Sequence, residues 1–309
     1  MAQAMPIWRL NGSRVLDLSR PRVIAILNVT PDSFADGGQL STPQRAADAA
    51  RRAVDEGADA LDVGPASTRP GADPVDADEQ IRRAAPAIKA IRDAGVEQPI
   101  TIDTTLAPVA RAALDAGADA INDVSAGQED PDLLPLAVER GVGLILMHRR
   151  VPPAHDQYAD RYERTPDYGA HGVVHAVRAS LAEQLDAAHR AGVPRERVVL
   201  DPGLGFGKSV EQNLELLRGT PELLGLGCPV LSALSLKNFV GRVGLGRDSA
   251  PAERLPATLA LSVAHLRLGV RLFRVHNVPE HRQALDAAWA ARSDDERVEQ
   301  ADGVRGFPS

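Results

Sequence analysis

The chain has 309 residues, of which 44% are hydrophobic, and a formal net charge of −7 at pH 7. This apolar content supports a large core and excludes a disordered chain, and a single barrel domain commonly takes roughly 250 residues. The basic residues are scattered, which argues against nucleic acid, because phosphate binding needs a basic face. No apolar run has the roughly 18 residues of a membrane span. The one cysteine, Cys228, permits no intrachain disulfide, so we expect a cytoplasmic protein.

Taken in chain order, short apolar runs alternate with amphipathic segments. Eight runs are β-branched and almost continuously apolar, as in strands buried on both faces: residues 23–29, 60–64, 100–103, 120–124, 143–148, 198–201, 229–235 and 272–276. Parallel strands joined by helices require right-handed crossovers and predict a single (β/α)8 TIM barrel. A doubly wound open sheet is the alternative fold.

The segments between the strands have recognisable helix ends. Asp76 followed by Glu79 is a capping-box pattern that opens a helix, and Gly95 follows its end. The longest helix is expected at residues 171–191, and a C-terminal one at 252–268.

Three further features concern the organisation of the chain. The sequence Gly-Ala-Asp occurs at residues 57–59 and again at 117–119, which predicts the same helix-to-strand connection twice. We expect one domain over residues 1–309, with its barrel core at about 22–292. Residues 1–18 are predicted to add an N-terminal hairpin, and residues 293–309 a flexible charged tail.

Polar side chains stand at the ends of almost all the predicted strands. They are Asn28, Asp62, Asp103, Asn122, Asp123, His148, Asp201, Ser235, Lys237, Arg274 and His276. The carboxyl ends of barrel strands form the active-site mouth, and polar groups are costly to bury without a partner. Any one carboxylate could equally cap a helix or tie a loop. The whole set predicts a site for a polar ligand that carries an amidine-like edge and an anion.

Lysine is rare in this chain, where it occurs only at positions 89, 208 and 237. Lys208 ends a glycine-rich segment, residues 203–209, that follows a strand and precedes a helix as a P-loop does. A P-loop has four residues between its first glycine and Gly-Lys-Ser, whereas only three follow Gly203, so this interpretation is rejected. Three tyrosines after the fifth strand either stack a ligand or pack a long loop onto the barrel rim: Tyr158, Tyr162 and Tyr168.

Several motifs follow one another in order. They are Asn-Val-Thr-Pro-Asp-Ser-Phe at 28–34, Asp-Val-Gly at 62–64, Ser-Thr-Arg-Pro-Gly-Ala at 67–72, Ile-Asp-Thr at 102–104, Ile-Asn-Asp-Val at 121–124, Leu-Met-His at 146–148, Asp-Pro-Gly-Leu-Gly-Phe-Gly-Lys at 201–208 and Arg-Val-His at 274–276. Between about residues 23 and 285 the chain therefore resembles the dihydropteroate synthases. The resemblance implies a transferase of folate biosynthesis that joins 6-hydroxymethyl-7,8-dihydropterin diphosphate to 4-aminobenzoate and releases pyrophosphate. It also implies a homodimer formed through C-terminal helices such as residues 252–268.

The resemblance assigns the pterin pocket. It implies that acceptors for the 2-amino-pyrimidinone edge come from Asp103, Asn122 and Asp201. Lys237 would reach the ring carbonyl or N5, Met147 would form the floor, and Arg274 and Phe206 would lie on the two faces of the ring.

The resemblance also assigns the anion and the second substrate. The leaving diphosphate would be bound by Asn28, Thr68, Arg69, Arg274 and His276, with Mg²⁺ bridging Asn28 to phosphate oxygens. Phe34, Asp36 and Pro70 would close over the aminobenzoate, with Asp36 also steadying a pterin-methyl cation. Ser235 would hold the aminobenzoate carboxylate near a helix N-terminus.

Three positions depart from the family pattern. The chain has Ser-Leu-Lys-Asn at 235–238 where the family usually has Ser-Arg-Lys-Ser, so Leu236 replaces an arginine near the second substrate. Ala66 replaces a glutamate and Asn277 an aspartate. These departures leave two alternatives: a pterin-binding paralogue without synthase activity, and a pterin-dependent protein resembling the methyltransferases on this fold.

Overall fold

The protein is a closed parallel barrel in a computed structural model that describes residues 7–30 and 42–292. Eight strands lie in the order β8-β7-β6-β5-β4-β3-β10-β9. They are β3 (Arg22–Asn28), β4 (Ala60–Gly64), β5 (Ile100–Asp103), β6 (Ala120–Asp123), β7 (Gly143–Met147), β8 (Val198–Asp201), β9 (Leu231–Ser232) and β10 (Leu272–Val275). A parallel bridge between Leu200 and Val230 joins the two ends of the sheet. The predicted (β/α)8 barrel is therefore confirmed, and the open sheet is wrong.

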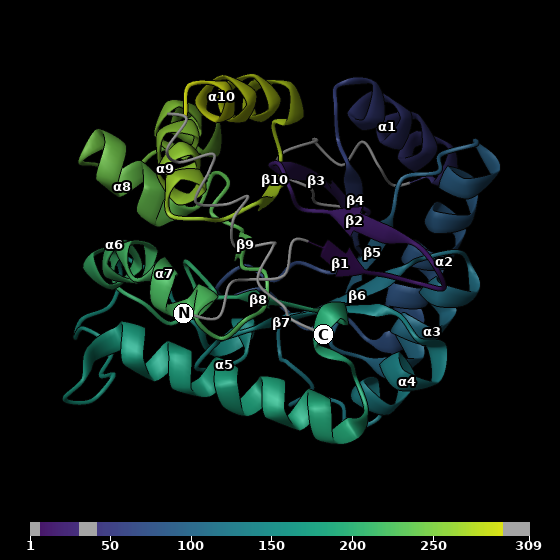
Figure 1. The fold of residues 1–309 in the computed structure, drawn as a ribbon, viewed down its shortest axis with the longest axis horizontal. Helices are drawn as coiled ribbons and strands as arrows, with labels where there is room; N and C mark the ends of the chain where they lie inside the picture. The colour runs from purple at the N-terminus through teal and green to yellow at the C-terminus, as the bar shows by residue number, and fades with distance from the viewer. Residues whose placement is uncertain (1–6, 31–41, 293–309) are drawn as a thin grey trace, which may run out of the picture.

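Helices surround the strands (Figure 1). They are α1 (Pro43–Asp55), α2 (Ala77–Asp93), α3 (Ala107–Asp115), α4 (Leu133–Arg140), α5 (Gly172–Ala191), α6 (Val210–Arg218), α7 (Thr220–Leu224), α8 (Asn238–Leu245), α9 (Leu255–Arg267) and α10 (Val278–Ala290), with short 3-10 turns η1 (Pro153–His155), η2 (Arg195–Arg197) and η3 (Pro251–Arg254). Half of the predicted capping box of α2 is present: Asp76 accepts a hydrogen bond from the Glu79 amide at 2.8 Å, while the Glu79 carboxylate pairs with Arg82 and Arg83.

Two predicted elements are shorter than expected, and proline explains why each begins later than predicted. Of the strand expected at 229–235, only Leu231 and Ser232 pair with β10. Pro229 has no N–H to donate to the ladder. The helix expected at 252–268 begins at Leu255, after a 3-10 turn, because Pro256 fits only the first turn of an α-helix.

The N-terminal hairpin closes one end of the barrel. Strands β1 (Ile7–Arg9) and β2 (Val15–Asp17) pair in antiparallel fashion, as predicted. Trp8 and Leu10 are fully buried, and the Trp8 indole donates to the Arg197 carbonyl at 2.9 Å. They pack against residues that face the barrel interior near the strand starts, namely Ile24, Ala60, Ala120, Ile145, Val199, Leu231, Ala233 and Leu272. A ligand must therefore enter from the opposite end, where the strands finish.

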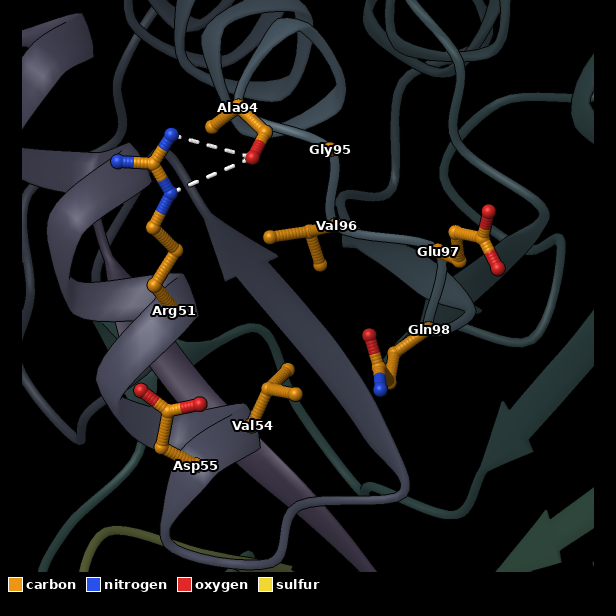
Figure 2. Close-up of a pocket in the computed structure, with 8 residues that line it drawn as sticks. All are labelled: Arg51, Val54, Asp55, Ala94, Gly95, Val96, Glu97 and Gln98. Carbon is orange, nitrogen blue, oxygen red and sulfur yellow. Dashed lines mark hydrogen bonds between the residues drawn. The ribbon is translucent and has the colours of Figure 1, made fainter.

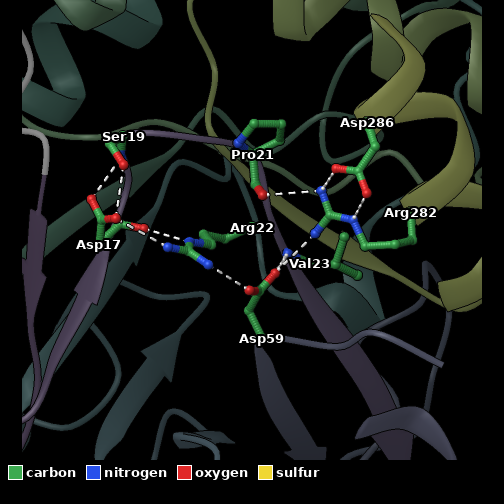
Figure 3. Close-up of polar contacts among 8 residues, drawn as sticks. All are labelled: Asp17, Ser19, Pro21, Arg22, Val23, Asp59, Arg282 and Asp286. Carbon is green, nitrogen blue, oxygen red and sulfur yellow. Dashed lines mark hydrogen bonds and ion pairs between the residues drawn. The ribbon is translucent and has the colours of Figure 1, made fainter. Parts of the chain in front are cut away.

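The repeated Gly-Ala-Asp sequence forms the same connection twice, as predicted. Asp59 accepts a hydrogen bond from the Val23 amide at 2.9 Å, and Asp119 accepts one from the Ile100 amide at 2.9 Å. Arginines neutralise both carboxylates: Arg22 and Arg282 pair with Asp59 (Figure 3), and Arg14 and Arg92 pair with Asp119. Each aspartate thereby binds a backbone amide at the start of a neighbouring strand, which helps to fix the register of the sheet.

A surface groove with a volume of about 360 Å³ lies between the end of α1 and the connection from α2 to β5 (Figure 2). The Arg51 guanidinium crosses it to the Ala94 carbonyl at 3.1 Å. This groove lies at the start of β5, away from the polar strand ends. Within residues 7–30 and 42–292, no helix combines the length and apolar character needed to cross a membrane.

Candidate active site

The polar site arises from the two-residue period of the strands. Alternate side chains of a barrel strand face its interior, so each strand presents a series of layers. In β10 and the residue after it, Leu272 lies in the apolar layer above the hairpin, while Arg274 and His276 follow towards the mouth. In β8, Val199 is succeeded in the same way by Asp201. Along β8 and β10 the interior thus changes from apolar to polar between one inward-facing residue and the next.

A buried ion-pair cluster occupies the first polar layer. Arg274 donates from Nε to Asp62 at 2.6 Å and from Nη2 to Asp103 at 2.8 Å. Asp62 is fully buried and also accepts from the Thr101 hydroxyl, while the Asn122 amide lies 3.4 Å from both its oxygens. These contacts direct two of the Arg274 donor groups at carboxylates, so anion binding by Arg274 stays a prediction. The sequence places Asp62 among the polar residues at the strand ends, but the family resemblance gives it no role in substrate binding.

Two carboxylates face the mouth with capacity to accept further hydrogen bonds. Burial raises the pKa of Asp103 to about 7 against the opposing charge of Arg274. Its Oδ1 is buried and has no hydrogen-bond partner in the described part of the chain. Burial likewise raises the pKa of Asp201, whose Oδ1 accepts from the Gly203 amide at 2.7 Å. A ligand edge with several N–H donors would satisfy these acceptors.

An apolar patch lies beside the acceptors. Val124, Met147 and Phe206 pack together near the strand ends. The Lys237 ammonium lies 4.4 Å from the centre of the Phe206 ring and donates to the Leu204 carbonyl. Burial lowers the pKa of Lys237 to about 8. The Phe206 ring, the Lys237 ammonium and the carboxylate acceptors together suit a planar heterocycle that carries both hydrogen-bond donors and acceptors.

Ser235 and His276 form a second polar pair. The Ser235 hydroxyl accepts from the His276 backbone amide at 3.1 Å and lies 3.1 Å from His276 Nδ1. When the hydroxyl donates its own hydrogen to Nδ1, the imidazole hydrogen is on Nε2. Burial, and next the charge of Arg274, lower the pKa of His276 to about 3, so the ring is neutral at neutral pH. The ring can therefore donate one N–H to an anion.

The loop between β4 and α2 carries Thr68, Arg69 and Pro70, which are half-buried. Its base is held by Arg83, which donates to the Pro65 carbonyl at 2.9 Å. Further along, the Gly71 amide donates to the Pro153 carbonyl in the loop after β7, at 2.8 Å. The charge of Arg69 acts on His276 and contributes to lowering its pKa. The loop thus brings a cation towards the Ser235–His276 pair.

Asn28 ends β3 at the same mouth. Its Oδ1 lies 3.2 Å from the place where a side chain on Gly64 would begin, so the bare glycine leaves room for the amide. Among the other predicted residues, Phe34 and Asp36 lie outside the described residues. The structure therefore places Asp103, Asn122, Asp201, Lys237, Phe206 and Met147 at or just beyond the carboxyl ends of the strands, with Asn28, Arg69, Ser235 and His276 at the same end of the barrel.

Comparison with known proteins identifies relatives of this chain. Residues 24–276 match the family of pterin binding enzymes. A dihydropteroate synthase of Synechocystis sp. is 40% identical over 273 residues, which are 87% of this chain and 91% of that protein. A probable bifunctional folylpolyglutamate synthase/dihydropteroate synthase of Haloferax volcanii is 46% identical over 270 residues, which are 87% of this chain and only 30% of that protein. The solved structure of Xanthomonas albilineans dihydropteroate synthase with 4-aminobenzoic acid is 39% identical, with a TM-score of 0.81 over 93% of this chain and 99% of that one.

Proposed function

This chain belongs to the dihydropteroate synthase family of pterin-binding enzymes, and from that membership we propose that it condenses 6-hydroxymethyl-7,8-dihydropterin diphosphate with 4-aminobenzoate to give 7,8-dihydropteroate and pyrophosphate. The observation that carries the proposal is the acceptor set Asp103, Asn122 and Asp201 beside the apolar patch of Val124, Met147 and Phe206. This combination matches the donor-bearing edge and the flat face of a pterin.

The proposed reaction breaks the bond between the exocyclic carbon and the diphosphate, which leaves with the bonding electrons. The amine of 4-aminobenzoate then bonds to that carbon and loses a proton. Binding energy is best directed at the leaving anion and at keeping water from the pterin-methyl cation. We assign the anion to Arg69, to Thr68 on the same loop and to the neutral His276, and the effect of the Arg69 charge on the His276 pKa supports this assignment. Asp36, outside the described residues, keeps its predicted role of steadying the cation.

Magnesium fits the residues at this mouth. Mg²⁺ usually keeps several waters and is bound by one or two protein oxygens together with substrate phosphates. The described residues hold no group of three or more His, Cys, Asp or Glu side chains that could bind a metal, and the amide oxygen of Asn28 is the protein ligand we propose. The ion would supply positive charge to the diphosphate oxygens. We also propose a cytoplasmic location, since Cys228 is a buried, free thiol.

The decisive experiment incubates the purified full chain with both substrates and Mg²⁺. Dihydropteroate and pyrophosphate are expected to appear in equal amounts. Pterin binding without any product would overturn the synthase proposal. That outcome would favour the second candidate, a pterin-binding paralogue without synthase activity. The observation behind this candidate is Leu236, which stands where the family usually has an arginine.

Leu236→Arg is expected to lower the KM for 4-aminobenzoate by roughly ten- to a hundredfold, because a charge-assisted hydrogen bond contributes about 1.5–3 kcal/mol. Leu236 is half-buried next to Ser235 and has a positive φ of 56°, so arginine adds no new backbone strain. Its carbonyl accepts from Arg254 at 2.9 Å, which fixes the backbone. Pterin affinity should stay unchanged in steady-state and binding assays.

Leu236→Met is the matched control, since it keeps an uncharged side chain of similar length. Its KM for 4-aminobenzoate should stay within about threefold of the native value. An equal gain in both variants would show that the charge at position 236 is irrelevant to the second substrate.

We propose further that the chain forms a homodimer through α9. Several apolar side chains of this helix are only half-buried, among them Leu255, Leu259 and Val263. On neighbouring α8, Leu245 is 41% exposed. The barrel-facing side of α9 carries Thr258, Ser262 and His265, so its apolar side chains are largely on the outer faces, and such an apolar outer face is normally covered.

The dimer is tested by sedimentation analysis, in which the native chain should sediment as a dimer. Leu259→Glu should be monomeric, because it puts a charge into the apolar interface. Val138→Glu, an equally polar change at an exposed site on α4, should leave the dimer intact. A monomeric native chain would refute this arrangement.

A further inference from the structure

A buried lysine lies behind the turn that presents Phe206. The turn, residues 203–208, connects β8 to α6. Lys208 is fully buried, and its Nζ donates to the carbonyls of Gly203 and Phe206, both at 2.8 Å. The third neighbour is His148 Nδ1 at 3.1 Å. A lysine ammonium has three donors and no acceptor, so these three partners satisfy it.

The backbone of the turn lies very close to His148 on one side and to Lys237 on the other. Gly203 has a φ of 66°, and a side chain there would begin 1.9 Å from the His148 carbonyl oxygen. Gly205 has a φ of 83°, and a side chain there would begin 2.9 Å from the Lys237 side chain. Only glycine fits these two positions. The Lys237 side chain thus rests directly on the backbone of the turn, and its ammonium donates to the Leu204 carbonyl.

The long loop after β7 holds the same turn from outside. The Gly207 amide donates to Asp156 at 2.9 Å, and the Tyr168 hydroxyl donates to the Gly207 carbonyl at 2.9 Å. The Tyr162 hydroxyl donates to the other oxygen of Asp156. Tyr162 and Tyr168 therefore tie the loop to the barrel rim, the second of the two roles that the sequence left open. The turn is fixed from both sides, and Lys208 supplies the buried side.

We propose that Lys208 is a positioning residue for pterin binding: its ammonium holds the 203–208 turn in the shape that sets the Phe206 ring and the Lys237 side chain against the pterin. The inference rests on the proposed function for the identity of the ligand. It assigns Lys208 no contact with substrate, because the side chain is fully buried and its donors are all directed at the protein.

Loss of the ammonium would leave two buried carbonyls without a donor, so the turn would relax. Lys208→Met is therefore expected to weaken binding of the pterin diphosphate by roughly ten- to a hundredfold in calorimetry. The KM for 4-aminobenzoate should change by less than about threefold. Lys89→Met is the matched control, because Lys89 is an exposed lysine on α2 that pairs with Asp93 one turn along the same helix. It should bind the pterin as the native chain does.

A second measurement uses the native protein. Burial lowers the pKa of Lys208 to about 7, so its protonation can be followed near neutral pH. With only three lysines, ¹³C-lysine labelling gives few signals to assign. The charged or titratable groups facing Lys208 come from the end of β7, the loop after it, β8 and the loop after β9, namely His148, Arg150, Asp156, Asp201 and Lys237.

If the protonated lysine holds the binding shape, pterin must in turn favour the protonated lysine, since coupling between sites is reciprocal. Uncharged 6-hydroxymethylpterin is the probe, so that no phosphate charge acts on the lysine. Its binding should raise the pKa of Lys208 by about one unit, which corresponds to tenfold tighter binding to the protonated form. A lysine that only stabilised the fold would show no such change.

The outcomes separate cleanly. The inference is supported if a folded Lys208→Met binds pterin at least tenfold more weakly than the native chain and the Lys208 pKa also rises in the native chain, or by that rise alone where the variant does not fold. A native chain that binds pterin with no rise in the Lys208 pKa overturns it, as does a folded Lys208→Met that binds pterin within about threefold of native. A native chain that binds no pterin overturns the proposed function, and this inference with it.

Discussion

Arg274→Ala is expected to lower the free energy of unfolding by about 3–5 kcal/mol, because it removes one partner of a buried ion-pair cluster. Asp62 and Asp103 are 0% and 6% exposed, and both are bound directly by Arg274. Without the guanidinium, two carboxylates remain buried close together with no cation between them. Urea denaturation at neutral pH measures the loss.

Arg282→Ala is the matched control. Arg282 also pairs with two aspartates, Asp59 and Asp286, but their side chains are 14% and 57% exposed. Water can solvate the carboxylates left behind, so the expected loss is about 1 kcal/mol. Equal losses in the two variants would refute the view that the Arg274 cluster is a desolvated one.

The loss of unfolding free energy caused by Arg274→Ala, called the stability deficit below, should also depend on pH. Burial raises the pKa of Asp103 to about 7 in the folded chain, above the usual value of 3.8 for the unfolded one. Stability contributed by this protonation is present below the unfolded pKa and is lost as pH rises through the folded pKa. Removing Arg274 removes a charge that holds this pKa down, so the stability deficit should be smaller at about pH 5.5 than at about pH 8.

Much of the barrel was predictable because its determinants are local. Apolar runs predicted the strands in chain order, and the polar residues at their ends predicted that Arg274 and His276 lie at the barrel mouth. The repeated Gly-Ala-Asp sequence predicted the two matching connections, and a hairpin was expected at residues 1–18. The overestimated strand at 229–235 shows the limit, because a largely apolar run does not reveal how many of its residues find a partner in the ladder.

The partners within the site could not be predicted, because they depend on register between distant segments. Arg274 lies far from Asp62 and Asp103 in sequence, and only the sheet order β10-β3-β4-β5 brings them together. The family resemblance therefore assigned Arg274 to the diphosphate, whereas in the structure two of its donor groups bind carboxylates. The rarity of lysine draws attention to Lys208, but a glycine-rich sequence does not show that its ammonium donates to the carbonyls of the preceding turn.

Asp103→Asn and Asp201→Asn are each expected to weaken binding of the pterin diphosphate by about 2–4 kcal/mol, which is about 30- to 1,000-fold. Each change turns one carboxylate oxygen into an N–H donor that would face the donors of the pterin edge. The shapes are conserved, so the folded structure should survive. Calorimetric titration with the pterin diphosphate measures the loss directly.

Asp119→Asn provides the matched control, because Asp119 is an equally buried aspartate at the closed end of the barrel. It should cost stability, since Asp119 accepts from the Ile100 amide and pairs with Arg92, yet leave pterin affinity unchanged.

The two pocket aspartates should also differ in how pterin affinity responds to pH. Since burial raises the pKa of Asp103 to about 7, affinity in the native chain should rise between about pH 5.5 and pH 7, as this carboxylate loses its proton and becomes a full acceptor. Asp103→Asn has no proton to lose at this position, so most of that rise should disappear, whereas Asp201→Asn should retain it. If both variants bind the pterin as tightly as the native chain, the acceptors for its edge lie elsewhere. The strand ends that carry Asp103 and Asp201 would then not form the pterin site.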